Sequence, residues 1–307
     1  MVFYFLFWLL AFLRCTASFT TCRNAPSRQR QSSSLLKAAD CWPSIAEIEV
    51  QHLSGETVKL GQVLKKEEQT VILSCLSHFG DFNAWELTQQ YIPATQGDDL
   101  ITCPVVLVGI GSVESANQFA DDLSLSNNDY LTLLVDEKGA VTEALGCYRG
   151  WLAVDQSHAE RWPATDVNPY IKLLGMIFGF GSPGTISRVL YGYVGDKTGG
   201  PQSRKWVVDS LLHGSEKGRW PALTQEAFEG VPDDSGLRPF ELATLRAQTG
   251  IHIVLNWSKL GPKNGDLFTR MGGTFVFQNE RCIYEYFDTG ILAYASMGEV
   301  SEATKST

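Results

Sequence analysis

The chain has 307 residues, of which 44% are hydrophobic and 19% charged, a composition typical of an ordinary soluble globular protein with one large domain or two modest ones. Its formal net charge is -9. The first 44 residues hold five basic residues and one acidic residue, so the remainder carries 20 basic against 33 acidic residues, a net charge of -13. Such an acidic surface repels nucleic acids and anionic membranes, which excludes nucleic-acid binding.

The N-terminus has the composition of a targeting sequence. Residues 2–13 form an apolar run, VFYFLFWLLAFL, which suits the core of a signal peptide and is too short to span a membrane. Small residues follow, so we predict a signal peptide over residues 1–17. Residues 18–36 contain Arg23, Arg28 and Arg30, five serines and no acidic residue. This composition predicts a transit peptide over residues 18–44.

A signal peptide joined to a transit peptide resembles the bipartite presequence of algae with secondary plastids. The segment Ala17-Ser18-Phe19 resembles the cleavage motif of those presequences, in which a phenylalanine follows the cleavage point. The resemblance implies delivery through the secretory pathway to the plastid stroma. The alternative is plain secretion with a disordered stalk.

The predicted elements then alternate in chain order between short apolar runs and amphipathic segments. One helix is expected to begin at Asn83, with Glu86 as its capping-box partner, and another at Ser112. The expected strands cover residues 48–50, 71–76, 105–108 and 131–135, and a short helix covers 141–145. This order predicts an α/β sheet with helices on both faces.

Residues 151–267 depart from this alternation and are predicted to form a long, mostly helical insert. Residues 173–187 carry no charge and are interrupted by Ser182-Pro183-Gly184. This pattern predicts two helices joined by a turn and packed on the core, with Lys172 and Arg188 facing solvent.

A small apolar patch of this hairpin, around Phe178, Phe180 and Pro183, is expected to contact a protein partner or a second copy of the chain. Further along the insert, a helix is expected over residues 238–249, ended by Gly250.

The last part of the chain predicts an antiparallel hairpin, with strands over residues 274–277 and 282–287. A final helix is expected over 290–297. The polar residues 299–307 are expected to be disordered, so the folded domain is predicted over 45–298.

Several segments are similar to the peroxiredoxin-like alkyl hydroperoxide reductase C/thiol-specific antioxidant (AhpC/TSA) family. Residues 133–148 (LLVDEKGAVTEALGCY) and 270–286 (RMGGTFVFQNERCIYEY) resemble two of its strand-and-turn segments. A closer likeness, to a cyanobacterial and plastid branch, lies in FGDFNAWELTQQ (79–90), GFGSPGTISRVLYGYVGD (179–196) and RPFELATLR (238–246). The resemblance implies a thioredoxin-like fold, with a central mixed sheet flanked by helices and the insert before the last hairpin. It also implies a redox or antioxidant role.

The chain departs from this family where the chemistry would lie. Family peroxidases place a cysteine in the first turn of the helix after the first core strand, where the helix dipole stabilises the reactive thiolate. The peroxiredoxin-like relatives have Gly-Cys-x-x-Cys there, and this chain has Asp81 and Ala84 at those cysteine positions. A carboxylate suits the same electrostatics but cannot reduce a peroxide. Gly272-Gly273 stands where thioredoxins carry a cis-proline.

Two other cysteines are the leading thiol candidates for catalysis. Cys75 lies within a predicted buried strand, and Cys147 lies at the end of a predicted helix. Burial and the negative helix end both disfavour a thiolate, so neither candidate is strong.

Cofactor and metal sites are not expected. Gly109-Ile110-Gly111 lacks the third glycine of a dinucleotide motif, and Glu114 stands in its place. The five histidines are scattered without ligand spacing. Three hypotheses therefore remain: a peroxiredoxin-like protein without the usual peroxidase chemistry, a non-catalytic binding or scaffold protein that uses the insert, and a thiol reductase of organic peroxides or lipids that acts through Cys75 or Cys147.

Overall fold

The computed structural model describes residues 41–65, 70–96, 100–151, 167–194, 200–232 and 235–305. All of these belong to one compact unit, Leu36–Thr307, whereas Met1–Leu35 form another unit. The predicted signal peptide, and the predicted transit peptide up to residue 40, lie outside the described residues. Among the described residues, the structure contains no helix with the length and apolar character needed to cross a bilayer.

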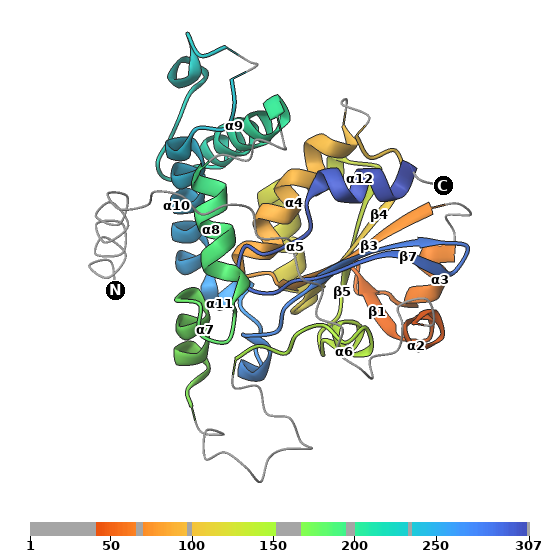
Figure 1. Cartoon of the computed structure of the whole chain (residues 1–307). Coiled ribbons are helices and arrows are strands. Elements are labelled where there is room, and N and C mark those ends of the chain that lie inside the picture. Colours follow the sequence, from red (N-terminus) through yellow and green to blue (C-terminus); the bar gives the residue numbers. More distant parts are fainter. Residues whose placement is uncertain are drawn as a thin grey trace. The chain divides into compact units, whose positions relative to one another are not determined.

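The strands form one mixed sheet in the order β2-β1-β5-β4-β3-β6-β7 (Figure 1). Their bounds are β1 Glu49–His52, β2 Thr57–Lys59, β3 Thr70–His78, β4 Val105–Ile110, β5 Leu131–Val135, β6 Gly273–Gln278 and β7 Arg281–Phe287. Strands β3, β4 and β5 are parallel in the centre, and antiparallel strands extend the sheet on both sides. The predicted mixed sheet flanked by helices is confirmed.

Helices cover both faces of the sheet, so β3 is buried along its whole length. Successive β3 side chains point to opposite faces, with Ile72 and Leu76 in one apolar cluster and Leu73 and Cys75 in the other. The first cluster lies under α4 (Phe82–Thr95), α5 (Val113–Leu123) and α12 (Met297–Lys305). The second lies under α2 (Trp42–Ala46), α3 (Leu60–Lys65) and α6 (Ala140–Ala144).

The start of α4 differs from the prediction. Asp81 is the N-cap and Asn83 lies inside the helix, so the predicted Asn83–Glu86 capping box is wrong. Both side chains bind distant partners instead, as described below. The prediction for α5 is confirmed, because the Ser112 hydroxyl accepts a hydrogen bond from the Ser115 amide at 3.1 Å.

The two ends of the folded region also differ from prediction. Trp42 of α2 is buried and packs edge-on against Phe277 at 5.6 Å, so ordered packing begins within the range predicted for the transit peptide. The expected helix over 290–297 is absent, and the expected disordered tail forms α12. This helix is held by tertiary contacts, because Val300 is buried and the Ser301 hydroxyl donates to the Leu100 carbonyl at 2.7 Å.

The insert is mostly helical, as predicted. Its helices are α7 Pro169–Ile177, α8 Gly184–Val194, α9 Gly200–Glu216, α10 Pro239–Leu255 and α11 Trp257–Leu260. Helix α10 does not end at Gly250, because Ile253 beyond it is buried in the apolar cluster shared with α4 and α5.

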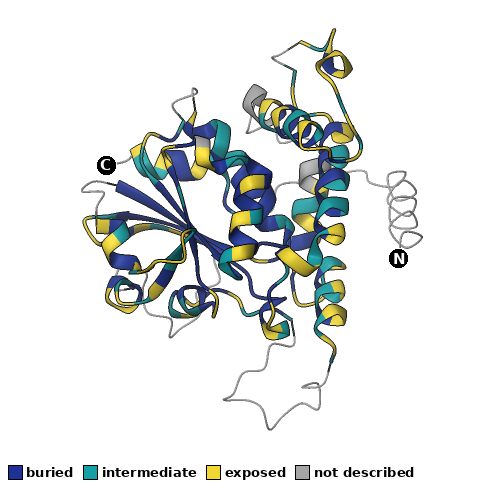
Figure 2. Cartoon of the chain, turned by 180° about the vertical axis from the view of Figure 1, so that it is seen from behind, coloured by how far each residue is buried: buried dark blue, intermediate teal, exposed yellow. Residues whose placement is uncertain are grey.

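The α7–α8 hairpin is less buried than the sequence indicated (Figure 2). Phe178 and Phe180 are each about half exposed, at 49% and 60%. Lys172, which was expected to face solvent, is buried, and Arg188 is half-buried with its guanidinium donating to the Tyr286 hydroxyl at 3.2 Å. The exposure of Phe178 and Phe180 agrees with the predicted patch, and Met176 is buried, but the predicted burial is wrong for Ile171, Leu174, Ile186 and Leu190, which are about half exposed.

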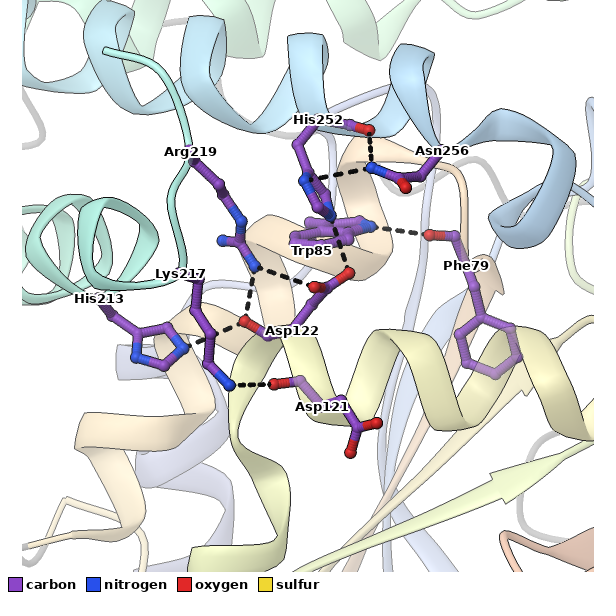
Figure 3. Close-up of polar contacts among 9 residues, drawn as sticks. All are labelled: Phe79, Trp85, Asp121, Asp122, His213, Lys217, Arg219, His252 and Asn256. Atoms are coloured by element: carbon purple, nitrogen blue, oxygen red, sulfur yellow. Dashed lines mark hydrogen bonds and ion pairs between the residues drawn. The ribbon is translucent and has the colours of Figure 1, made fainter. Parts of the chain in front are cut away.

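One anchor of the insert is the C-terminal end of α5 (Figure 3). The Asp122 carbonyl accepts hydrogen bonds from Arg219 at 2.5 Å and from His213 at 3.1 Å, and Lys217 donates to the Asp121 carbonyl at 2.7 Å. The Asp122 carboxylate contacts His252 of α10 at 2.8 Å. Basic groups suit this place because the carbonyls of a helix end carry its negative dipole.

A second anchor joins α4 to α10. The Glu86 carboxylate accepts two hydrogen bonds from the Arg246 guanidinium, at 2.9 and 2.8 Å, and a third from the Tyr294 hydroxyl at 2.5 Å. Glu86 and Arg246 are both nearly buried, so this bidentate pair is shielded from solvent.

Candidate functional site

The loop between β3 and α4 places Asp81 at the start of a buried helix. Its amide donates to the His78 carbonyl at 2.9 Å, and its backbone is extended, with φ -109° and ψ 144°. The side chain caps none of the helix amides. It is buried, and its Oδ2 atom has no hydrogen-bond partner in the structure.

A second carboxyl group, Asp288, lies near enough for the charge of Asp81 to raise its pKa. Asp288 follows β7 and is also buried. Asn83 connects its loop to α4, because Asn83 Nδ2 donates to Asp288 Oδ2 at 3.1 Å and to the Gly290 carbonyl at 3.2 Å. Asn83 Oδ1 accepts from the Leu292 amide at 2.5 Å. These backbone partners, one an acceptor and one a donor, determine the orientation of the Asn83 amide.

The two carboxyl groups interact electrostatically. The pKa of Asp288 is raised to about 8, mainly by burial and also by the negative charge of Asp81, while the hydrogen bond from Asn83 acts in the opposite direction. Asp288 is therefore mostly protonated at neutral pH. Its second oxygen, Oδ1, has no hydrogen-bond partner in the structure. The start of α4 thus holds two buried carboxyl groups, each with one oxygen that has no hydrogen-bond partner in the structure.

His78 adds a third polar group at the same place. Its Nε2 lies 3.2 Å from the Phe268 carbonyl, which can only accept, so Nε2 carries the proton and Nδ1 is an acceptor. Burial lowers the pKa of His78, although Asp81 and the Phe268 carbonyl oppose the effect, so the ring is neutral at pH 7. The imidazole packs edge-on against Trp257 at 5.6 Å, and Trp257 Nε1 donates to the Tyr170 hydroxyl at 3.2 Å.

The insert holds the loop that carries Asp288. The Ile291 amide donates to Thr185 Oγ1 at 2.9 Å. The contact is so close that a Cβ on Gly290 would lie 2.5 Å from the same Thr185 atom, and a Cβ on Gly184 would lie 2.1 Å from Thr289 Oγ1. The Gly-Ser-Pro-Gly-Thr segment of the insert therefore packs directly on this loop, and these two glycines allow the approach.

The thiol candidates lie close to the carboxyl pair but are poor nucleophiles. Burial, and then the neighbouring Cys147 thiol, raise the pKa of Cys75. Burial and the Asp288 carboxyl raise the pKa of Cys147, with Arg270 opposing. Since the thiolate is the reactive form, neither cysteine is activated here.

The remaining cysteines are no better placed. Burial raises the pKa of Cys103 to about 11, and a hydrogen bond with Cys41 together with burial raises the pKa of Cys282. The predicted place for a cis-proline is filled by Gly272, where a Cβ would lie 1.9 Å from the Cys75 carbonyl oxygen. Within the described ranges, no three His, Cys, Asp or Glu side chains gather as metal ligands would.

Sequence reasoning identified Asp81 and missed its partners Asp288 and Asn83. Asn83 was interpreted as a helix cap. One signal in the sequence could have identified Asp288. It directly follows a predicted strand and begins the tripeptide Asp288-Thr289-Gly290, which is of the kind that forms tight functional loops.

No protein-family model matches this chain, and no curated protein matches it. Among solved structures, the chain is similar to reduced Prx3 from Vibrio vulnificus, a peroxiredoxin crystallised in complex with H2O2. The two are 12% identical, with a TM-score of 0.23, and the match covers 34% of this chain and 65% of that chain. A similarity of this size is a weak structural resemblance and leaves the chemistry of the site to be inferred from its own residues.

Proposed function

We propose that this chain is a peroxiredoxin-like protein with a thioredoxin-like fold that works by binding and not by thiol peroxidase chemistry. The observation that carries the proposal is the carboxyl pair at the start of α4. Asp81 occupies the position where relatives with peroxidase activity hold a thiolate, and Asp288 near it is protonated at neutral pH. A carboxyl pair can bind and exchange protons but cannot reduce a peroxide.

The binding role would use the insert. The insert contacts the loop that carries Asp288 through Thr185, and it also presents apolar side chains to solvent, including Phe178 and Phe180, next to Pro183. A partner bound to this face would therefore lie on the same structural unit that positions the carboxyl pair.

Peroxide reactivity tests this proposal. We expect the chain from Leu36 onward to show no fast, stoichiometric sulfenic acid formation with hydrogen peroxide or an organic hydroperoxide, because the pKa values of Cys75, Cys103, Cys147 and Cys282 are raised. Thiol titration and mass spectrometry of trapped sulfenic acid would measure it. Cys103→Ser is the control, since Cys103 is partly exposed and would account for slow labelling.

The alternative function is a thiol reductase of organic peroxides or lipids. One observation favours it, namely that Cys75 and Cys147 are both buried and lie near enough for the Cys147 thiol to raise the pKa of Cys75. Rapid oxidation of one cysteine, abolished by Cys75→Ser or Cys147→Ser, would support the reductase and contradict the binding role.

We also propose that the protein acts in a plastid stroma and reaches it through the secretory pathway. The support is the apolar run of residues 2–13 followed by the arginine- and serine-rich, acid-free stretch of residues 18–36. A fluorescent protein fused after residue 44 should enter the plastid of an alga with secondary plastids. Phe19→Ala should leave it in the endomembrane system, and unchanged plastid import of that variant would refute the cleavage motif.

A further inference from the structure

The α7–α8 hairpin presents a continuous apolar surface to solvent. Ile171 and Leu174 of α7 and its C-cap residue Phe178 are spaced three and four residues apart and therefore lie on one side of the helix. They are 58%, 53% and 49% exposed. On α8, Ile186 and Leu190 are four residues apart, and both are about half exposed. We call these five residues, together with Phe180, the apolar hairpin face.

The two helices share this face at the turn that joins them. A Cβ on Gly179 would lie 2.8 Å from Ile186 Cδ1, so the α8 side chain touches the backbone between the two phenylalanines. Phe180 itself stacks on Trp151, with ring centroids 5.8 Å apart. The apolar side chains of α7 and α8 therefore come together at the Phe178–Phe180 turn.

Within residues 169–190, neither charged side chain opens onto this face. Residues 169–190 contain two charged side chains, Lys172 and Arg188. Lys172 is buried, and Arg188 donates to the Tyr286 hydroxyl at 3.2 Å. The rest of the chain is strongly acidic, with a net charge of -13 after residue 44.

The size of the face fits a dimer interface. Six side chains, each about half exposed, leave on the order of 500 Å² of apolar surface in water, given ~150–250 Å² for a whole aromatic side chain. The largest apolar patch of a typical monomer is about 300–600 Å², and a stable complex buries about 800 Å² per partner. The face thus supplies most of what one partner contributes, and the polar rim would supply the rest.

We propose that the apolar hairpin face is covered by the same face of a second copy of this chain, in a two-fold symmetric dimer. This names the partner for the binding role proposed above and rests on it. An uncharged face has no charge pattern that would select a different protein, whereas apolar helices match their own copy equally well. A membrane is a poorer match, since an anionic surface would repel the acidic remainder of the chain.

Sedimentation velocity of the chain from Leu36 onward, over a range of micromolar concentrations, tests the proposal. We expect a dimer for the unmodified chain and a monomer for Leu174→Glu, with unchanged circular dichroism because residue 174 is exposed. Ile171→Lys is a second disrupting variant, should Leu174→Glu fail to fold. Tyr130→Glu is the matched control, because Tyr130 is 46% exposed outside the insert and its replacement should leave the dimer intact.

Three results would overturn the dimer. The first is an unmodified chain that stays monomeric at every concentration, and the second is a folded Leu174→Glu variant that stays dimeric. The third is an unmodified chain that is monomeric and floats with phosphatidylcholine vesicles, together with a Leu174→Glu variant that does not float. This result would assign the face to a neutral membrane surface. Each result is independent of the peroxide test, so failure of the dimer and failure of the proposed binding role can be told apart.

Discussion

Asp288→Asn should stabilise the protein, and the gain should grow with pH. The pKa of Asp288 is 3.8 in an ordinary setting and about 8 in the fold. Between these values the native state holds a proton that the unfolded chain has lost, so the stability of the natural protein falls as pH rises from about 4 to about 8. Asparagine cannot ionise and keeps an oxygen to accept from Asn83, so the variant escapes this loss.

The expected size of the effect is large. The pKa of Asp288 differs between the folded and unfolded states, and each pKa unit is worth about 1.4 kcal/mol. Relative to Asp288→Asn, the natural protein therefore loses at most roughly 5 kcal/mol of unfolding free energy at pH 8 and roughly 3 kcal/mol at pH 6. Chemical denaturation of the two proteins at several pH values measures it. Below pH 4 the difference in stability between the two proteins should be small, since Asp288 is then mostly protonated in the native and in the unfolded state.

Asp81→Asn is the companion variant. It removes the charge that helps to raise the pKa of Asp288, so the decline of stability with pH should become shallower without disappearing, because burial remains. Equal stability of Asp288→Asn and the natural protein from pH 4 to pH 8 would mean that Asp288 is ionised in the native state. The assignment of a protonated Asp288 near Asp81 would then be wrong.

The strands around this site were predictable because their sequence patterns are local. Runs such as residues 71–76 and 131–135 are apolar except for Ser74 and Thr132, so buried strands follow directly from them. The strand at residues 131–135 has the bounds of β5, and β3 extends its predicted run by a few residues.

The partners of Asp81 were not predictable in this way. Asn83 meets Asp288 across 205 residues of chain, and nothing near either residue indicates that the loop after β7 returns to the start of α4. Helix α12 is a similar case, since its sequence is polar and its helix depends on the burial of Val300. Features held by tertiary contacts leave little trace in local periodicity.

The exposure of the α7–α8 hairpin was wrongly predicted for a related reason. An apolar helical pattern shows that a face avoids water, but it does not show whether the cover is the same chain or another molecule. Lys172 misled in the opposite direction, because a lysine can bury its stem against the body of the protein.

Replacing Arg246 should loosen the insert from the core. Arg246→Met removes both hydrogen bonds to Glu86 and leaves its carboxylate buried without its ionic partner. Breaking a buried ion pair in this way costs about 3–5 kcal/mol. We expect that loss in chemical denaturation, together with faster hydrogen exchange along α10, because Glu86 and Arg246 join α4 to α10.

Two comparisons separate the buried charge from other effects. In the double variant Glu86→Gln/Arg246→Met the orphaned charge is gone, so much of the stability should return, since an uncharged replacement of a buried pair is often close to neutral. Arg149→Met is the matched control, because Arg149 and Glu143 form an ion pair with side chains 42% and 51% exposed, and its loss should cost less than about 1 kcal/mol. If Arg246→Met is no more destabilising than Arg149→Met, the Glu86–Arg246 pair does not hold the insert. The position of the Asp288 loop must then depend on its contact with Thr185 and on the hydrogen bonds that Asp122 makes at the end of α5.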